Sequence, residues 1–255
     1  MGSFSKLSTT VKLEWFYLLL AILFAIYFWP KSNKTDLVIA KKDSTAVTEV
    51  KEIKYSLQID RIDAKSFTAN YYASLTPSAP IADTNFASVS ERLKGRVEFY
   101  SNQVLIKINF KNGKSYNLQD GDYLFFIAYF PSEDILLCEG GHTTDVSFNL
   151  STGQETEETG NPYYIVNDCN LERRLNAYYG GQECYSYFIQ ERTDSGFKKI
   201  LSVNESFNAL SPLSNLCTII DAFWLNSKTL LIKADVSDKN GNPTTLHYKL
   251  TLIEK

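Results

Sequence analysis

The sequence predicts a mainly β protein, in which one N-terminal transmembrane helix precedes an antiparallel β domain. Residues 15–29 (WFYLLLAILFAIYFW) form an apolar run without charge or Gly. The whole sequence contains 16 Tyr and 16 Phe against one Met, and aromatic residues are typical of strands. Apolar and polar residues alternate repeatedly after residue 52, as they do in half-buried strands.

The apolar run at residues 15–30 is best explained as an uncleaved signal-anchor. As a helix it spans about 22 Å, somewhat less than a hydrocarbon core of about 30 Å. A tryptophan at each end, with Lys12 and Lys31 just beyond, suits the two membrane interfaces. The alternatives are a cleaved secretory signal and a buried core helix. A cleaved signal is less favoured because the nearest small-residue triplet, 38–40, lies about ten residues past the run.

The orientation of the domain depends on two conflicting observations. More lysines follow the run than precede it, and the positive-inside rule then favours a cytoplasmic domain. The four cysteines are even in number, which favours an exported domain with disulfides. We expect a single-pass membrane protein with an extracytoplasmic domain. Its expected parts are a tail (1–14), an anchor (15–30), a polar linker (31–52) and a β-rich soluble domain (53–255).

The cysteine positions predict two disulfides. Cys169 and Cys184 flank one polar, glycine-containing segment, so a bridge between them would close a loop. Cys138 and Cys217 then remain as a second pair. The alternative is four free thiols in a protein core, where cysteine is common.

Turn sequences locate the expected hairpins. Asn112-Gly113 follows the alternating run Val104–Phe110, and this dipeptide accepts the positive φ angles of a tight turn. Residues 193–196 and 238–241 predict two further hairpins. The near-continuous apolar run 123–130 predicts a central strand. The segment Leu171–Tyr179 is the one that we expect to be helical.

The segment 135–155 ends in Leu150-Ser151-Thr152-Gly153. This turn resembles the one that closes a strand in a β-propeller blade, and residues 195–203 resemble the start of a following blade. The resemblance implies a small propeller-like domain, and it implies a binding platform as readily as an enzyme. A sandwich of two antiparallel sheets is an equal alternative, because no repeat of 40–50 residues runs through the chain.

The segment between Cys169 and Cys184 is the candidate recognition surface. It carries Arg173, Arg174, Tyr178 and Tyr179, and Arg and Tyr are enriched at binding hot spots. In a binding loop these four side chains should face solvent. The alternative is a short helix that packs one tyrosine into the core.

No familiar catalytic or nucleotide-binding motif is present in the sequence. Glu139, His142 and Asp145 have the side-chain chemistry of a metal or acid–base cluster. A polar turn explains the same residues more simply, so we predict no metal and no cofactor.

The formal net charge of −3 argues against a nucleic-acid partner. The sequence therefore predicts a membrane-tethered extracytoplasmic binding or assembly module without catalysis, with a protein or glycan partner. The alternative is an anchored hydrolase or carbohydrate-active enzyme that uses dispersed carboxylates.

Overall fold

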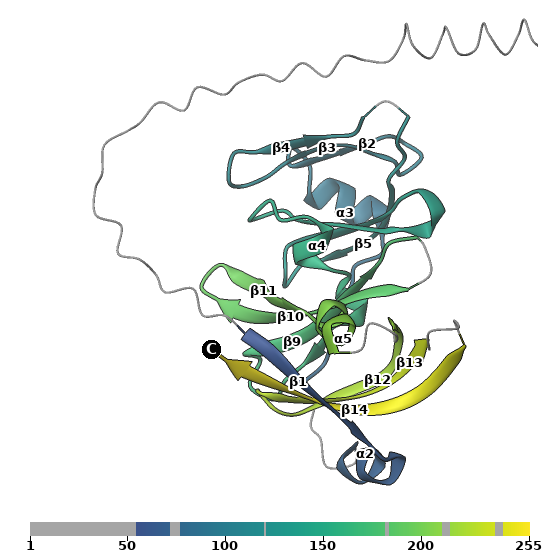
Figure 1. Cartoon of the computed structure of the whole chain (residues 1–255). Coiled ribbons are helices and arrows are strands. Elements are labelled where there is room, and N and C mark those ends of the chain that lie inside the picture. The colour runs from purple at the N-terminus through teal and green to yellow at the C-terminus, as the bar shows by residue number, and fades with distance from the viewer. Residues whose placement is uncertain (1–54, 72–76, 120, 182–183, 211–214, 238–241) are drawn as a thin grey trace, which may run out of the picture. The chain divides into compact units, whose positions relative to one another are not determined.

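The computed structural model describes residues 55–71, 77–119, 121–181, 184–210, 215–237 and 242–255 (Figure 1). The expected tail, anchor and linker lie outside these ranges, as does the expected turn at 238–241. Within the described ranges, no helix has both the length and the apolar character needed to cross a membrane.

The described residues form four antiparallel sheets in a mainly β structure (Figure 1). The first sheet contains β2 (Val97–Phe99), β3 (Leu105–Asn109) and β4 (Ser115–Asn117). The second contains β5 (Phe125–Phe130), β6 (Ile135–Glu139) and β7 (Asp145–Asn149). The third contains β8 (Val166–Asn167), β9 (Arg173–Tyr179), β10 (Tyr185–Thr193) and β11 (Gly196–Ser202). The fourth contains β12 (Asn215–Asn226), β13 (Thr229–Ser237), β14 (Pro243–Glu254) and β1 (Tyr55–Ile62). Neighbouring strands follow sequence order, except that β1 pairs with β14.

Short helices connect or cover these sheets. They are α2 (Ala64–Tyr71), α3 (Phe86–Arg92), α4 (Thr156–Thr159), α5 (Val203–Leu210) and the 3₁₀ turns η1 (Gly141–Thr143) and η2 (Pro162–Tyr164). Phe67 of α2 packs against Phe223 and Leu231 of the fourth sheet. In α3, the Asn85 side chain accepts a hydrogen bond from the Ser88 N–H (3.0 Å), which satisfies a backbone donor at the start of the helix.

Two apolar cores hold the sheets together in pairs. The first core joins the first and second sheets and includes Leu105, Ile108, Leu136 and Phe148, all at most 1% exposed. The second core joins the third and fourth sheets and includes Leu175, Ile189, Trp224, Ile232 and Leu250. Removal of these side chains from water is the main force that favours such packing.

Polar side chains connect the second sheet to the third. The carboxylate of Asp145, at the start of β7, accepts hydrogen bonds from the Asn161 side chain (2.8 Å) and the Tyr179 N–H (2.7 Å). Burial raises the pKa of Asp145, and these two hydrogen bonds oppose the rise. Gln190 of β10 donates to the Glu158 carbonyl oxygen (2.6 Å). The contact between these two sheets is therefore partly polar.

Two of the predicted hairpins are confirmed. Asn112-Gly113 connects β3 to β4, and Gly113 has a φ of +84°. Thr193 lies opposite Gly196 in the β10–β11 hairpin. The prediction of a central strand at 123–130 is wrong, because β5 lies at the end of its sheet and β6 is central. Phe126 belongs to the first apolar core and Phe130 to a separate small cluster, whereas Phe125 and Ile127 are exposed.

The predicted helix at Leu171–Tyr179 is wrong. Residues Arg173–Tyr179 form strand β9, which pairs with β8 on one side and β10 on the other. Five consecutive residues of this strand, Arg173–Ala177, are buried. Such a strand shows no simple alternation, so its periodicity does not distinguish it from a short helix.

The structure also corrects the disulfide pairing. Cys184 is bonded to Cys217, with Cα atoms 4.4 Å apart, within the range that a disulfide requires. Cys138 is a buried free thiol, and Cys169 is an exposed one. Cys169 and Cys184 lie beyond opposite ends of β9, and a strand of this length separates its ends by about 20 Å.

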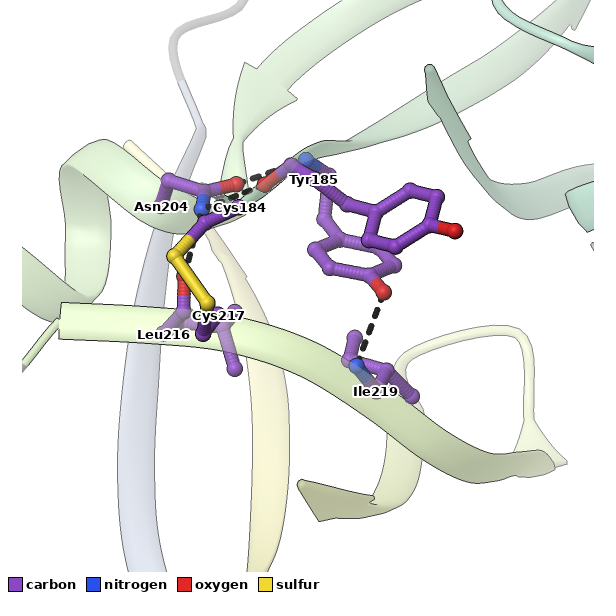
Figure 2. The surroundings of a disulfide bond; sticks show 7 residues. Cys184, Tyr185, Asn204, Leu216, Cys217 and Ile219 are labelled. Atoms are coloured by element: carbon purple, nitrogen blue, oxygen red, sulfur yellow. Dashed lines mark hydrogen bonds between the residues drawn. A yellow bond between two sulfur atoms is a disulfide. The ribbon is translucent and has the colours of Figure 1, made fainter. Parts of the chain in front are cut away.

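Figure 2 shows how the disulfide is supported. The Asn204 side chain of α5 donates hydrogen bonds to the carbonyl oxygens of Tyr185 and Leu216, both at 3.0 Å. The disulfide and Asn204 thus connect β10 to β12 at the same place.

Candidate functional site

The four predicted binding residues lie in β9 rather than on an open loop. Arg173 and Arg174 are 8% and 2% exposed, and Tyr178 and Tyr179 are half-buried. Both edges of β9 are paired with neighbouring strands. The expectation that these side chains face solvent is therefore wrong.

Arg174 is a buried cation with three contacts inside the protein. Its Nη1 lies 3.1 Å from Glu133 Oε1, and its Nε donates to Gln190 Oε1 at 2.6 Å. The guanidinium carbon lies 3.8 Å from the centroid of the Phe197 ring. Burial lowers the pKa of Arg174 to about 10, and the nearby Glu133 carboxylate opposes this shift. Arg174 therefore stays charged at neutral pH and links the second sheet to the third.

Arg173 connects the third sheet to the fourth in a similar way. Its Nη2 lies 2.7 Å from Glu191 Oε1, and its Nη1 donates to the Ser227 carbonyl oxygen at 2.9 Å. The guanidinium carbon is 5.5 Å from the Tyr55 ring centroid. Both arginines are thus committed to contacts within the protein.

A polar cavity of about 210 Å³ lies beside Arg174. Its lining comes from the β5–β6 and β10–β11 hairpins, the end of β7, α4 and strand β9, and it includes Glu133, Asp134, Asn149, Ser151, Thr159, Arg174, Gln190 and Phe197. We call it the polar cavity. Glu133 and Asp134 are the type of neighbouring carboxylates that a dispersed-carboxylate hydrolase would need.

The Asp134 carboxylate in this cavity is already occupied by four donors. Arg96 donates two hydrogen bonds to it (3.1 and 2.9 Å), and Tyr129 donates a third (2.8 Å). Ser151 also donates to it, and Lys111 Nζ lies 3.1 Å away. Burial disfavours the charged form, but these donors outweigh burial and hold the pKa of Asp134 well below its usual range. An acid of this kind does not release or accept protons near neutral pH, which makes it a poor general acid.

The Glu139, His142 and Asp145 candidate cluster adopts a turn. His142 and Thr143 have positive φ angles of 57° and 59°, and Asp145 is occupied by Asn161 and Tyr179. In the part of the chain that the structure describes, no group of three or more His, Cys, Asp or Glu side chains is placed to hold a metal ion.

A second cavity, of about 310 Å³, opens on the first sheet. Two tyrosines line it, Tyr100 at 57% and Tyr123 at 64% exposure. The other lining residues are Asn102, Val104, Ile106, Leu118, Gln119, Gly121 and Asp122. We call it the aromatic cavity. Its volume is at the lower end of the range for ligand pockets.

Two turns anchored on β3 form this cavity. In the first, the Tyr100 N–H donates to the Val104 carbonyl oxygen (2.8 Å) and connects β2 to β3. In the second, the Asp122 N–H donates to the Gln119 carbonyl oxygen (3.1 Å). Pairing of the β3 backbone with residues 118 and 124 holds this second turn beside the first. The tyrosines therefore come from separate turns that a common strand brings together.

The polar side chains of the aromatic cavity are free to bind a ligand. Asn102, Gln119 and Asp122 are exposed. None of the three side chains makes a hydrogen bond or an ion pair to another residue of the described ranges. The described lining residues include no Lys or Arg.

Sequence reasoning missed this cavity. The sequence points instead to the Arg and Tyr residues between Cys169 and Cys184, whereas Tyr100 and Tyr123 are single residues next to turns. The sequence Asp120-Gly121 before Tyr123 is a local turn signal, but nothing near Tyr100 in the sequence indicates that the two residues meet.

Comparison with known proteins identified no relative: no family model, no curated protein and no solved structure matches the chain.

Proposed function

We propose that this protein is a membrane-tethered extracytoplasmic binding module without catalysis, and that the aromatic cavity is its binding site. The observation that carries the proposal is the exposure of Tyr100 and Tyr123 on the lining of one cavity. Exposed aromatic rings supply contact area at low entropic cost.

Two other observations support the proposed location of the domain outside the cytoplasm and its attachment to a membrane. The apolar run at residues 15–29 has the composition of an anchor. The Cys184–Cys217 disulfide is typical of oxidising compartments outside the cytoplasm. Protease treatment of intact cells tests the orientation: we expect digestion of the domain, and protection until lysis would contradict it.

For the architecture, we propose an open propeller-like arrangement rather than a two-sheet sandwich. The first three sheets are each built from consecutive strands, as a propeller blade is, and so are three of the four strands of the last sheet. The early strand β1 completes the last sheet beside β14. This arrangement supports the blade resemblance of residues 135–155. The resemblance of residues 195–203 to the start of a following blade is wrong, because they form β11, the last strand of the third sheet.

The anchored hydrolase has weaker support. Glu133 and Asp134 line a cavity, but Glu133 is paired with Arg174 and Asp134 with Arg96 and Lys111. No observation on these carboxylates favours acid–base chemistry over a structural role.

The test of the binding function is co-purification from solubilised membranes. The full-length tagged protein should retain a molecule that the double variant Tyr100→Ala/Tyr123→Ala loses. The matched control is Tyr163→Ala, because Tyr163 is 50% exposed and does not line the aromatic cavity. Retention of the same molecules by all three proteins would contradict the proposed site.

A further inference from the structure

The lining of the aromatic cavity restricts the chemistry of its ligand. Among the described residues that line it, Asp122 is the one charged side chain, and none is a cation. An anionic ligand would meet an uncompensated carboxylate and no positive partner, which is unfavourable at short range. Phosphates, sulfates and acidic peptides are therefore poor candidates.

The remaining lining groups combine aromatic, aliphatic and amide chemistry. Val104, Ile106 and Leu118 provide apolar surface next to the two tyrosines. Asn102 and Gln119 each carry both hydrogen-bond donors and an acceptor, and Asp122 carries acceptors only. A ligand that fits must offer an apolar surface together with several neutral polar groups.

We propose that the aromatic cavity binds a neutral saccharide, an inference that rests on the proposed function of this site. The C–H groups on one side of a sugar ring are attracted to the negatively polarised faces of Tyr100 and Tyr123. The sugar hydroxyls both donate and accept hydrogen bonds, which matches the free side chains of Asn102, Gln119 and Asp122.

A small cation is the competing ligand chemistry. Tyrosine faces attract cations, and Asp122 would add a favourable charge. The two ligands differ in what they need from residue 122. A saccharide needs an acceptor, which Asn supplies, whereas a cation needs the negative charge.

The experiment measures saturable binding of neutral oligosaccharides to the full chain. The probes are cellohexaose, maltohexaose, laminarihexaose and N-acetylated chitohexaose. The protein is kept in a polyoxyethylene detergent, because a detergent with a sugar or choline headgroup would compete. Tetramethylammonium chloride is the cation probe.

We expect at least one oligosaccharide to bind saturably to the wild type. Tyr100→Ala and Tyr123→Ala should each weaken binding fivefold or more, as loss of a hot-spot residue does. Asp122→Asn should weaken it less than either, and the control Tyr163→Ala should leave it unchanged.

Several outcomes would overturn the saccharide proposal. They are the absence of saturable binding for all four oligosaccharides, equal binding by the tyrosine variants, and tetramethylammonium binding that Asp122→Asn abolishes. Failure of the saccharide proposal can be distinguished from failure of the proposed binding function. If a co-purified protein depends on Tyr100 and Tyr123 while no saccharide binds, the binding function stands and the ligand class is wrong. If no co-purified molecule depends on the two tyrosines and no saccharide binds, the proposed function and the ligand class are both wrong.

Discussion

The two cavities of this protein differ in how their charged and polar side chains are used. In the polar cavity, Glu133, Asp134 and Arg174 all have partners within the protein. In the aromatic cavity, the side chains of Asp122, Asn102 and Gln119 have no hydrogen-bond or ion-pair partner among the described residues. A cavity rich in charge can therefore be part of the scaffold. The less charged cavity, whose groups remain free, is the better candidate for binding.

This comparison predicts the largest stability loss at Arg174. Arg174→Met would leave the Glu133 carboxylate without its cation in a largely buried site, so we expect a loss of about 3–5 kcal/mol in the free energy of unfolding. Denaturant unfolding of the purified protein measures it. The double variant Arg174→Met/Glu133→Gln should recover a large part of the loss, because no charge is then left unpaired.

A matched control tests whether the stability loss is specific to the buried Arg174–Glu133 pair. Lys111→Met removes a cation whose side chain is 58% exposed, and exposed pairs contribute at most about 1 kcal/mol. Equal losses at Lys111 and Arg174 would show that the polar cavity is not the scaffold element described above.

The second largest effect is expected from the disulfide. Cys184 and Cys217 are separated by 33 residues in sequence, and closure of a loop of this size stabilises a fold by roughly 3–4 kcal/mol on the chain-entropy model. Cys184→Ser should lower stability by about this amount, whereas Cys169→Ser should have little effect because Cys169 is exposed and free.

Alkylation of the unreduced, denatured protein followed by mass spectrometry checks the pairing. We expect two modified cysteines, Cys138 and Cys169. Four modified cysteines would exclude the disulfide and weaken the argument for export. Binding at the aromatic cavity should survive Cys184→Ser wherever the variant is still folded, because the disulfide joins the third and fourth sheets.

A third, intermediate effect concerns Asp134 and pH. The pKa of Asp134 is lower in the folded protein than its ordinary value near 4. Its ionised form therefore stabilises the fold above that value, and the stabilisation is lost as the pH falls below it. Asp134→Asn should cost about 2 kcal/mol at pH 7, since hydrogen bonds to a charged group are removed.

The dependence of the free energy of unfolding on pH tests this contribution of Asp134. The wild type should lose stability more steeply than Asp134→Asn between about pH 5 and pH 2. Parallel profiles for the two proteins would mean that the Asp134 network does not contribute to the fold as described.

The local parts of the fold could be predicted from the sequence, and the nonlocal parts could not. Asn112-Gly113 predicts its hairpin because the turn geometry depends on two adjacent residues. The pairing of Cys184 with Cys217 depends instead on the approach of β10 to β12, which no local pattern encodes. The sequence predicts a helix where β9 forms, because the buried arginines of this strand obscure the alternation typical of a strand.

The candidate site was harder to predict for a related reason. Arg173 and Arg174 have side chains typical of hot spots, but Glu191 and Glu133 neutralise them inside the protein. Residue type alone does not reveal whether an arginine is exposed or paired. Tyr100 and Tyr123 meet only because β3 places two turns side by side.

The smallest stability effect is predicted for the two tyrosines of the aromatic cavity. Its measurement distinguishes most directly a residue that binds ligand from one that stabilises the fold. Tyr100 and Tyr123 are more than half exposed, and neither ring packs against another aromatic ring among the described residues. Surface substitutions of this kind usually change stability by no more than about 0.5 kcal/mol. Tyr100→Ala and Tyr123→Ala should therefore unfold at nearly the wild-type denaturant concentration while they lose ligand. A stability loss of about 2 kcal/mol or more at either position would show that the tyrosine belongs to the scaffold, as Arg174 does, and the aromatic cavity would no longer differ from the polar one.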